Sequence, residues 1–240
     1  QIVVAALTVS FGIKINMVPY PLISMPLAIF WMVAIMNSFN LLDNMDGLSG
    51  GIGAIIGMVL FLFSVISGNF EVGLPALILA GSLLGFLRYN FNPAKIFMGD
   101  SGSMFIGFIL GVITLQGSWK ESAHLVMVLF VPILVLAVPI FDTMFVAFVR
   151  SVNSRKVFEG GKDHISHRMV VLGLTEKKAV FALYSISMVF GAISILSMFV
   201  KPIVTLVLIL LSAITLVYFG AFLGKVKVYE QKELNGIKKK

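Results

Sequence analysis

Cysteine is absent from the 240 residues of this chain, and charged side chains make up only 12% of them. Without cysteine the chain can form neither disulfides nor a metal site with thiolate ligands. The low charge accompanies a hydrophobic fraction of 59% and a mean hydropathy of +1.03, values far outside the usual composition of soluble globular domains. The composition therefore predicts an integral membrane protein.

Apolar stretches recur along the whole chain, and most approach the roughly 20 residues that a helix needs to cross a bilayer. Lipid offers no water to backbone groups, and the stretches lack the alternation of barrel strands, so helices are expected. We predict an all-α polytopic transmembrane helical bundle. Its eight predicted spans are residues 2–13, 20–38, 50–67, 74–89, 103–116, 123–149, 179–199 and 202–223. Pro132 and Pro139 lie inside the longest span, where they predict a kinked or broken helix.

Lys and Arg favour the cytoplasmic side of a membrane, so their distribution predicts the orientation. If the chain starts at the cytoplasm, loops 39–49, 88–102 and 150–178 and the tail 225–240 hold none, two, seven and six of them, which is 15 of 18. This bias predicts a membrane domain over 1–224 with a basic cytoplasmic tail, which would contact anionic lipid. Because the positive charge collects on one membrane face, nucleic acid is not an expected partner.

The stretch FNLLDNMDGLSGG, residues 39–51, places two carboxylates at the mouth of a predicted membrane helix. Asn37, Asn40, Asp43 and Asp46 recur every third residue, a spacing that lets neighbours in the series share a helix face. A carboxylate beside a membrane is costly unless it is wetted, paired or bound, so these residues are functional candidates. The alternative is a solvated loop in which Asp46 caps the next helix.

A second polar stretch, RYNFNPAKIFMGDSGSMFIG over residues 88–107, contains Asn90 and Asp100. Asp100 stands where the next helix begins, and the free N–H groups there attract anions. A cation on Asp100 and a phosphate on those amides would be neighbours. Magnesium prefers oxygen ligands and bridges carboxylates to phosphates, so it suits this site, with manganese as an alternative. An Asp before Ser-Gly-Ser is often only a helix cap, so this motif alone is weak evidence.

The third stretch, GGKDHISHRMVVLGL over residues 160–174, is rich in donors for phosphate oxygens. The donors are Lys162, His164, His167 and Arg168. They favour recognition of a phosphate or nucleotide. An ordinary basic loop is one alternative, and a zinc site is another, although two histidines without a thiolate seldom complete a zinc site.

Together the three stretches resemble the cytoplasmic motifs of the polyprenyl-phosphate N-acetylhexosamine-1-phosphate transferases in order, spacing and membrane side. The resemblance implies a plasma-membrane enzyme that transfers a sugar 1-phosphate from a UDP-N-acetylhexosamine to undecaprenyl or another polyprenyl phosphate and releases UMP. This is the first membrane step of cell-wall or surface-polysaccharide synthesis. GGKDHISHR is closer to the N-acetylglucosamine branch than to the peptidoglycan branch of phospho-N-acetylmuramoyl-pentapeptide transferase, so UDP-N-acetylglucosamine is favoured.

The same resemblance implies a role for each candidate residue. Asp100 is the implied magnesium ligand. The residues implied to be catalytic are Asp43, Asp46, His164 and His167. Those implied to bind the substrate are Asn37, Asn40, Asn90, Lys162 and Arg168.

Two departures from the family pattern affect these expectations. Ser166 stands where many relatives have the middle histidine of a His-x-His-His pattern, so no role of that histidine carries over. The family's adjacent Asp-Asp pair, which would precede the first span, does not occur in this chain, and the sequence begins at Gln1 without a signal peptide. We expect about two or three further spans upstream in the natural protein, and an inactive enzyme if residues 1–240 are purified alone.

An ion-coupled transporter is the alternative from another class, because intramembrane carboxylates and interrupted helices occur in transporters too. The sequence contains no visible internal repeat, and its polar residues gather at one membrane face, which favours the enzyme. Asp142, eight residues before Arg150, is expected inside the membrane, where it either packs the kinked helix or lines the site. A homodimer is left open.

Overall fold

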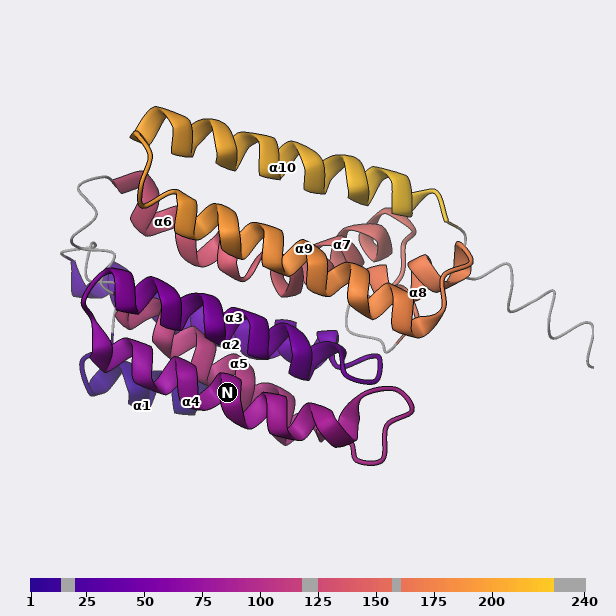
Figure 1. The fold of residues 1–240 in the computed structure, drawn as a ribbon, viewed down its shortest axis with the longest axis horizontal. Coiled ribbons are helices and arrows are strands. Elements are labelled where there is room, and N and C mark those ends of the chain that lie inside the picture. The colour runs from indigo at the N-terminus through magenta and orange to yellow at the C-terminus, as the bar shows by residue number, and fades with distance from the viewer. Residues whose placement is uncertain (14–19, 118–124, 157–160, 227–240) are drawn as a thin grey trace, which may run out of the picture.

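Helices alone make up the regular structure of the described chain. The computed structural model describes residues 1–13, 20–117, 125–156 and 161–226. Six helices in these ranges are long and apolar enough to cross a membrane: α2 (Pro21–Leu42), α3 (Leu48–Ile66), α4 (Phe70–Asn90), α5 (Gly99–Gln116), α9 (Glu176–Leu196) and α10 (Pro202–Gly224). They lie side by side in one bundle (Figure 1). The predicted all-α, multi-pass membrane fold is confirmed.

The two other predicted spans are not continuous helices of membrane length. The span expected at 2–13 is α1 (Ile2–Ser10), which has nine residues and packs against α2. The long span expected at 123–149 is divided into α6 (Leu125–Val135) and α7 (Ala137–Val152).

The break between α6 and α7 falls at Leu136, whose φ of −93° and ψ of 17° leave the helical range. Pro132 and Pro139 flank it, and each removes a backbone donor and crowds the preceding turn. The prediction of a broken helix is therefore confirmed, and α6 and α7 are separate helices.

Small residues let the membrane helices approach closely. A Cβ atom on Gly107 of α5 would lie 2.6 Å from the Cα of Met36 in α2, so only glycine fits this contact. Such close approach increases van der Waals attraction, which is a main source of helix association in lipid. α3 lies inside the bundle against α4, α5 and α9, with Ile52 and Ile56 fully buried.

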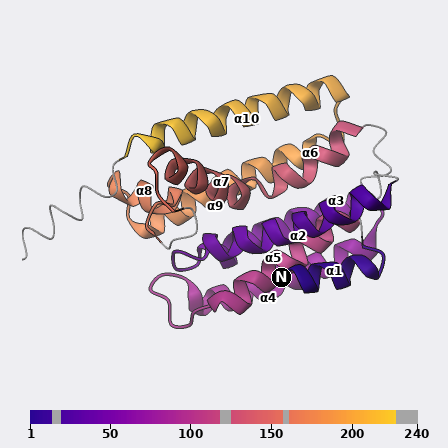
Figure 2. The same cartoon turned by 180° about the vertical axis from the view of Figure 1, so that it is seen from behind.

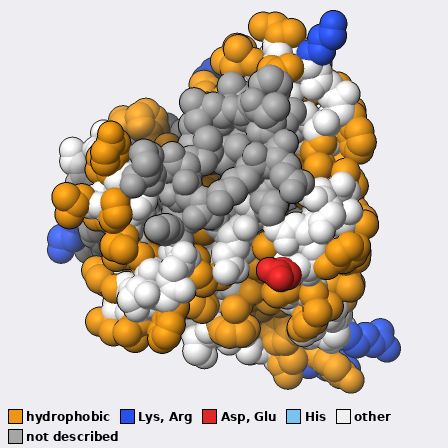
Figure 3. Space-filling model, turned by 90° about the vertical axis from the view of Figure 1, so that its left-hand side faces the viewer, with side chains coloured by type: hydrophobic (Ala, Val, Ile, Leu, Met, Phe, Trp, Pro, Cys, Tyr) orange, Lys and Arg blue, Asp and Glu red, His pale blue; other side chains and the backbone are white. Residues whose placement is uncertain are grey.

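The polar motifs all lie at one end of the bundle, which we call the motif end. It carries residues 43–47 between α2 and α3, residues 91–98 between α4 and α5, and α8 (Ile165–Val171), as Figures 1 and 2 show from two sides. At the opposite end the described surface is mainly hydrophobic and acidic side chains are scarce (Figure 3). The predicted convergence of three separate loops agrees with this arrangement.

Candidate active site at the motif end

Two carboxylates from different helices lie near one another at the motif end. Asp43 is the C-cap of α2, and Asp100 lies exposed in the first turn of α5. Asn40 connects the two helices: its Nδ2 donates to Asp100 Oδ1 at 3.1 Å and to Ser103 Oγ at 3.2 Å. Partial burial, and then the negative charge of Asp100, raise the pKa of Asp43 from 3.8 to about 6.

This pair has the chemistry of an incomplete cation site. The part of the chain that the structure describes contains no group of three or more His, Cys, Asp or Glu that could hold a metal. Asp43 and Asp100 would therefore supply only part of a coordination shell. Magnesium fits such a donor set, because it commonly takes one or two carboxylates and completes its shell with water and substrate phosphates.

Asp46 joins the first motif to the second. Its Oδ2 accepts hydrogen bonds from Ala94 N at 2.9 Å and from Asn92 Nδ2 at 3.3 Å. Asn92 also donates to Glu176 Oε2 at 3.0 Å, at the start of α9. In this structure Asp46 therefore holds the 91–98 loop in place, and its expected catalytic role stays a prediction.

Asn90 has a comparable holding role, because both ends of its amide bond to backbone. Its Oδ1 accepts from Gly47 N at 3.1 Å, and its Nδ2 donates to Ile96 O at 2.9 Å. Gly47, the N-cap of α3, has a φ of +77°, which favours glycine. The hydroxyl of Tyr184 in α9 donates to the carbonyl of the same glycine. Asn90 is only 4% exposed and holds the two loops together, and its expected substrate-binding role stays a prediction.

Asn37 lies farther from the loops. Its Nδ2 donates to Gln1 Oε1 and to Val33 O, each at 2.8 Å. Its hydrogen bonds thus connect α2 to the start of α1, and none of them reaches Asp43 or Asp100. The structure brings Asn40 to the carboxylate pair and leaves Asn37 outside it.

Asp142 of α7 contacts the start of α8, which we call the histidine helix. Asp142 Oδ2 lies 2.7 Å from His164 Nδ1, and Oδ1 accepts from Ile165 N at 2.9 Å. His164 and Asp142 are buried, at 4% and 1% exposure. The sequence left two roles open for Asp142, packing the broken helix or lining the site. The structure shows a third arrangement, in which Asp142 supports the candidate site residue His164.

Ser166 connects α8 to the first motif. Its buried Oγ donates to Asn44 Oδ1 at 2.6 Å. From the sequence, Ser166 was noted only as a departure from the family pattern. Asn44 was missed, because this residue is not part of the polar series that recurs every third residue from Asn37 to Asp46. A serine hydroxyl thus makes the contact between the histidine helix and the acidic loop.

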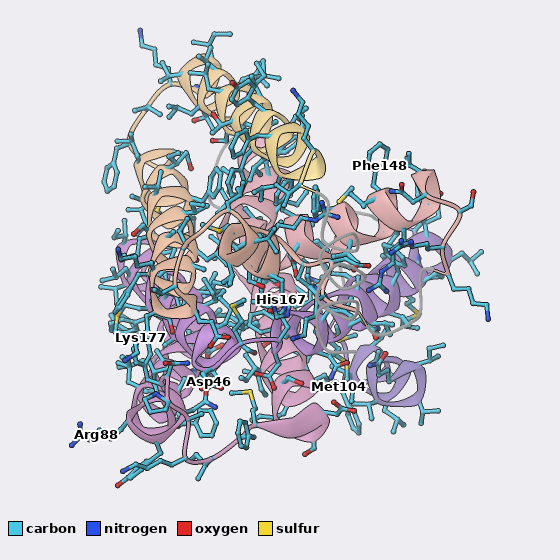
Figure 4. All side chains as sticks on the ribbon, turned by 90° about the vertical axis from the view of Figure 1, so that its right-hand side faces the viewer. Asp46, Arg88, Met104, Phe148, His167 and Lys177 are labelled. Carbon is cyan, nitrogen blue, oxygen red and sulfur yellow. The ribbon has the colours of Figure 1, made fainter. Side chains whose placement is uncertain are left out.

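His167 is the half-buried histidine of α8 and lies near the centre of the motif end in Figure 4, with Asp46 and Met104 on either side. Burial, and then the charges of His164 and Lys162, lower the pKa of His167 below 6.5, although nearby carboxylates oppose this shift. At neutral pH a neutral imidazole offers one N–H donor and one acceptor. Lys162 is exposed and can reach an anion in solution.

The guanidinium of Arg168 is bonded to backbone carbonyls. Its Nε donates to Asp163 O at 2.9 Å, and its Nη1 donates to Leu223 O at 3.0 Å and Val226 O at 2.7 Å. The side chain is 3% exposed, and burial lowers the pKa of its guanidinium. The geometry gives no support to the predicted substrate-binding role of Arg168, which instead binds the carbonyls where α10 ends.

A buried ion pair completes this support. Arg150 Nε lies 2.7 Å from Asp163 Oδ2, and both side chains are at most 4% exposed. The pair joins the end of α7 to the residue just before His164. Removing one partner of such a buried pair strongly destabilises a protein, because the remaining charge stays buried without compensation.

Comparison with known proteins finds a matching family model and several relatives with related names. Residues 1–118 match the family model described as glycosyl transferase family 4. The chain is 37% identical over 201 residues to a probable undecaprenyl-phosphate N-acetylglucosaminyl 1-phosphate transferase of Bacillus subtilis, covering 80% of this chain and 55% of the relative. It is 36% identical over 169 residues to a decaprenyl-phosphate N-acetylglucosaminephosphotransferase of Mycolicibacterium smegmatis, covering 63% and 42%.

A third relative belongs to the peptidoglycan branch. It is a phospho-N-acetylmuramoyl-pentapeptide-transferase of Staphylococcus aureus, 31% identical over 195 residues, with 78% of this chain and 58% of the relative covered. The chain spans about half the length of the curated relatives it matches. The family model and these relatives confirm the resemblance carried by the three motifs: the chain belongs to glycosyl transferase family 4.

Proposed function

We propose that the protein transfers N-acetylglucosamine 1-phosphate from UDP-N-acetylglucosamine to a polyprenyl phosphate at the cytoplasmic face of the plasma membrane, and releases UMP. The observation that carries this proposal is the pair of Asp43 and Asp100, with Asn40 bonded to Asp100, next to the loop in which Asn44 bonds to the histidine helix α8. Two relatives named for N-acetylglucosamine transfer are 37% and 36% identical, against 31% for the relative named for the muramoyl-pentapeptide. The bias of basic residues supports the cytoplasmic placement.

Magnesium would be held by Asp100 with Asp43 beside it. When bound, the ion would neutralise the negative charge that two phosphate groups bring together. Asn40 keeps Asp100 oriented through the 3.1 Å hydrogen bond. Because two acids share this small space, a cation would also relieve their mutual repulsion, which is part of the reason that the pKa of Asp43 is raised.

In the reaction, an oxygen of the lipid phosphate would attack the β-phosphorus of the UDP-sugar, and the bond to the bridging oxygen of UMP would break. Positioning and charge stabilisation carry most of the catalysis in such a transfer. Exposed Lys162 and the N–H of His167 are the donors suited to the phosphate oxygens. Asp46 and Asn90 would act indirectly, by holding the loops that surround the pair.

The nucleotide base has a candidate surface in the same loop. Phe97, three residues before Asp100, is 78% exposed at the motif end. An aromatic face stacks on any base, so Phe97 suits contact with the uracil. We expect Phe97→Ala to raise KM for the UDP-sugar more than it lowers kcat.

The test uses full-length protein in membranes, supplied with magnesium, lipid phosphate and either UDP-N-acetylglucosamine or UDP-N-acetylmuramoyl-pentapeptide. We expect UMP release and labelled lipid only with the first donor. Product from the pentapeptide alone would assign the protein to the peptidoglycan branch, and solute uptake without UMP release would make it a transporter.

A pair of variants tests the assigned metal ligand. Asp100→Asn should abolish magnesium-dependent turnover while membrane insertion is kept. Glu71→Gln is the matched control, because Glu71 lies in the first turn of α4, at the other end of that helix from the motif end. Near-normal turnover in Asp100→Asn would show that the ligand is misassigned.

A further inference from the structure

We propose that Asp142 is a positioning residue that fixes the ring orientation and the tautomer of His164, with the proton on Nδ1. The comparisons assign no role to Asp142, and the sequence left its role open. The inference rests on the proposed function in one respect: the kinetic test below measures the rate of the proposed transfer, whereas the NMR test needs no activity.

The two oxygens of Asp142 make different contacts. Oδ1 accepts from Ile165 N at 2.9 Å, a contact that binds the first N–H of α8, whereas Oδ2 lies 2.7 Å from His164 Nδ1. The three residues are at most 4% exposed, so water does not compete for these bonds. An ionised carboxylate only accepts hydrogen bonds, so Nδ1 must carry the proton.

The second ring nitrogen of His164 is then left for another partner. Nε2 has no hydrogen bond to any residue that the structure describes, and it is not among the fully buried side-chain atoms of the described chain that lack a partner. With the proton fixed on Nδ1, the Nε2 of a neutral ring presents a lone pair that accepts a hydrogen bond or a proton. The tautomer therefore decides whether His164 offers an acceptor or a donor.

The position of His164 makes this choice matter for the site. Ser166, two residues later on α8, bonds to Asn44 in the acidic loop at 2.6 Å. The ring of His167 lies 6.3 Å from that of His164, measured between centroids. The ion pair with Arg150 holds Asp163, the residue before His164. The histidine is thus fixed from several sides, and among the described residues Asp142 is the one bonded to the nitrogen that sets its tautomer.

The variant Asp142→Asn separates the two contacts of the carboxylate. The amide oxygen of asparagine can still accept from Ile165 N, so the N-terminus of α8 keeps its partner. The amide nitrogen can only donate, so it requires a lone pair at His164 Nδ1 and drives the proton to Nε2. A purely structural role would be preserved in this variant, and a tautomer-setting role would be reversed.

The direct test is 15N NMR of histidine-labelled full-length protein in nanodiscs, at a pH where the ring is neutral. The chain has three histidines, so His164→Gln assigns the signal. We expect a protonated Nδ1 in the wild type and a protonated Nε2 in Asp142→Asn. A wild-type ring with a bare Nδ1, or the same tautomer in both proteins, would overturn the proposal whether or not the protein is an active transferase.

Kinetics provide the second test. We expect kcat of Asp142→Asn to fall by about 10²-fold or more, which is the usual contribution of a correctly placed proton carrier. KM for the UDP-sugar should stay within about threefold of the wild type, because binding groups are untouched. Thr143→Val is the matched control, since the Thr143 hydroxyl bonds within α7, to Pro139 O at 3.0 Å.

The outcomes separate the role proposed for Asp142 from the proposed transferase function. A switched tautomer with unchanged kcat would show that Asp142 orients a histidine that catalysis does not use, and would overturn the expected effect of Asp142 on the reaction. Absence of transfer in the wild type would instead defeat the proposed function, while the NMR result would still decide what Asp142 does to His164.

Discussion

Asp43 is the residue whose chemistry depends most on its surroundings. Its carboxyl lies where α2 ends, partly buried and close to the charge of Asp100, and both effects favour the protonated form. A divalent cation favours the opposite form, because a metal ligand must be deprotonated. Protons and magnesium therefore compete at this residue.

This competition predicts a pH-dependent effect of magnesium on stability. The pKa of Asp43 is about 6 in the folded protein, against an ordinary value of 3.8, so without metal the protonated residue favours folding at low pH. That contribution is lost as the pH rises through about 6, whereas stabilisation by magnesium should grow over the same range. Thermal unfolding with and without millimolar magnesium, followed from acidic to neutral pH, measures both effects.

Asp43→Asn should make the stabilisation by magnesium small and independent of pH. Glu71→Gln, which changes an acid outside the motif loops, should behave as the wild type. Equal stabilisation at every pH in the wild-type protein would contradict a role for Asp43 beside the ion.

His167 offers a second prediction with a defined sign. The charge of Lys162 is one of the causes that lower the pKa of His167, after burial and the charge of His164. Lys162→Gln removes a positive charge and so should raise that pKa, which an NMR titration of the ring measures. An unchanged or lower pKa would mean that the exposed Lys162 does not lie near His167 in solution.

At the scale of elements, α8 depends on its neighbours. It has seven residues, whereas isolated helices shorter than about 12 residues are marginal in water. Groups from three other elements contact it: the Asp142 side chain of α7 at its start, the Asn44 side chain of the 43–47 loop, and the Leu223 carbonyl of α10, which accepts from Arg168. A short helix held in this way can keep two histidines in fixed positions.

Arg168→Lys should loosen this arrangement. Lysine has one compact ammonium group and cannot reproduce the separate bonds from Nε to Asp163 O and from Nη1 to Leu223 O. We expect a loss of about 1–3 kcal/mol in unfolding free energy, and faster hydrogen exchange in the last turn of α10. Arg88→Lys is the control because Arg88 is exposed at the rim of the motif end (Figure 4). An unchanged stability would mean that these bonds contribute little.

The sequence predicted elements better than side-chain directions. Hydrophobic length predicted eight spans, six of which are helices of membrane length, and Pro132 with Pro139 predicted a kink or break that the structure has at Leu136. Both signals are local. Asn90 and Arg168 have the residue types of ligand-binding groups, yet their donors bond to backbone of other elements. The backbone N–H that donates to Asn90 lies 43 residues away, and one partner of Arg168 lies 58 residues away, so no local pattern reveals these contacts.

Across the whole molecule, the bundle separates two different surfaces. Each connection at the motif end carries polar groups, and these meet through bonds such as Asn92 with Glu176, which lie 84 residues apart. The opposite end offers few charges in its described part (Figure 3). The polar groups of the described chain thus gather at one end of long apolar helices, as the proposed transfer at a membrane surface requires.

The proposed orientation of the bundle predicts which end is accessible from outside the cell. The chain contains no cysteine, so single cysteines can be introduced without background labelling from these residues. Lys95 is exposed in the 91–98 loop at the motif end, and Lys201 is exposed between α9 and α10 at the opposite end. Lys and Arg favour the cytoplasmic side, and the motif end carries most of them.

In intact cells that express the full-length protein, a membrane-impermeant maleimide should label Lys201→Cys at once and Lys95→Cys only after permeabilisation. The two variants serve as controls for each other, because both replace one exposed lysine and differ only in the end that they report. The reverse pattern would place Asp43, Asp100 and α8 outside the cell, away from cytoplasmic UDP-sugars. The same proteins would then still fold as a bundle, but transfer from a nucleotide donor would no longer be a tenable function for this end.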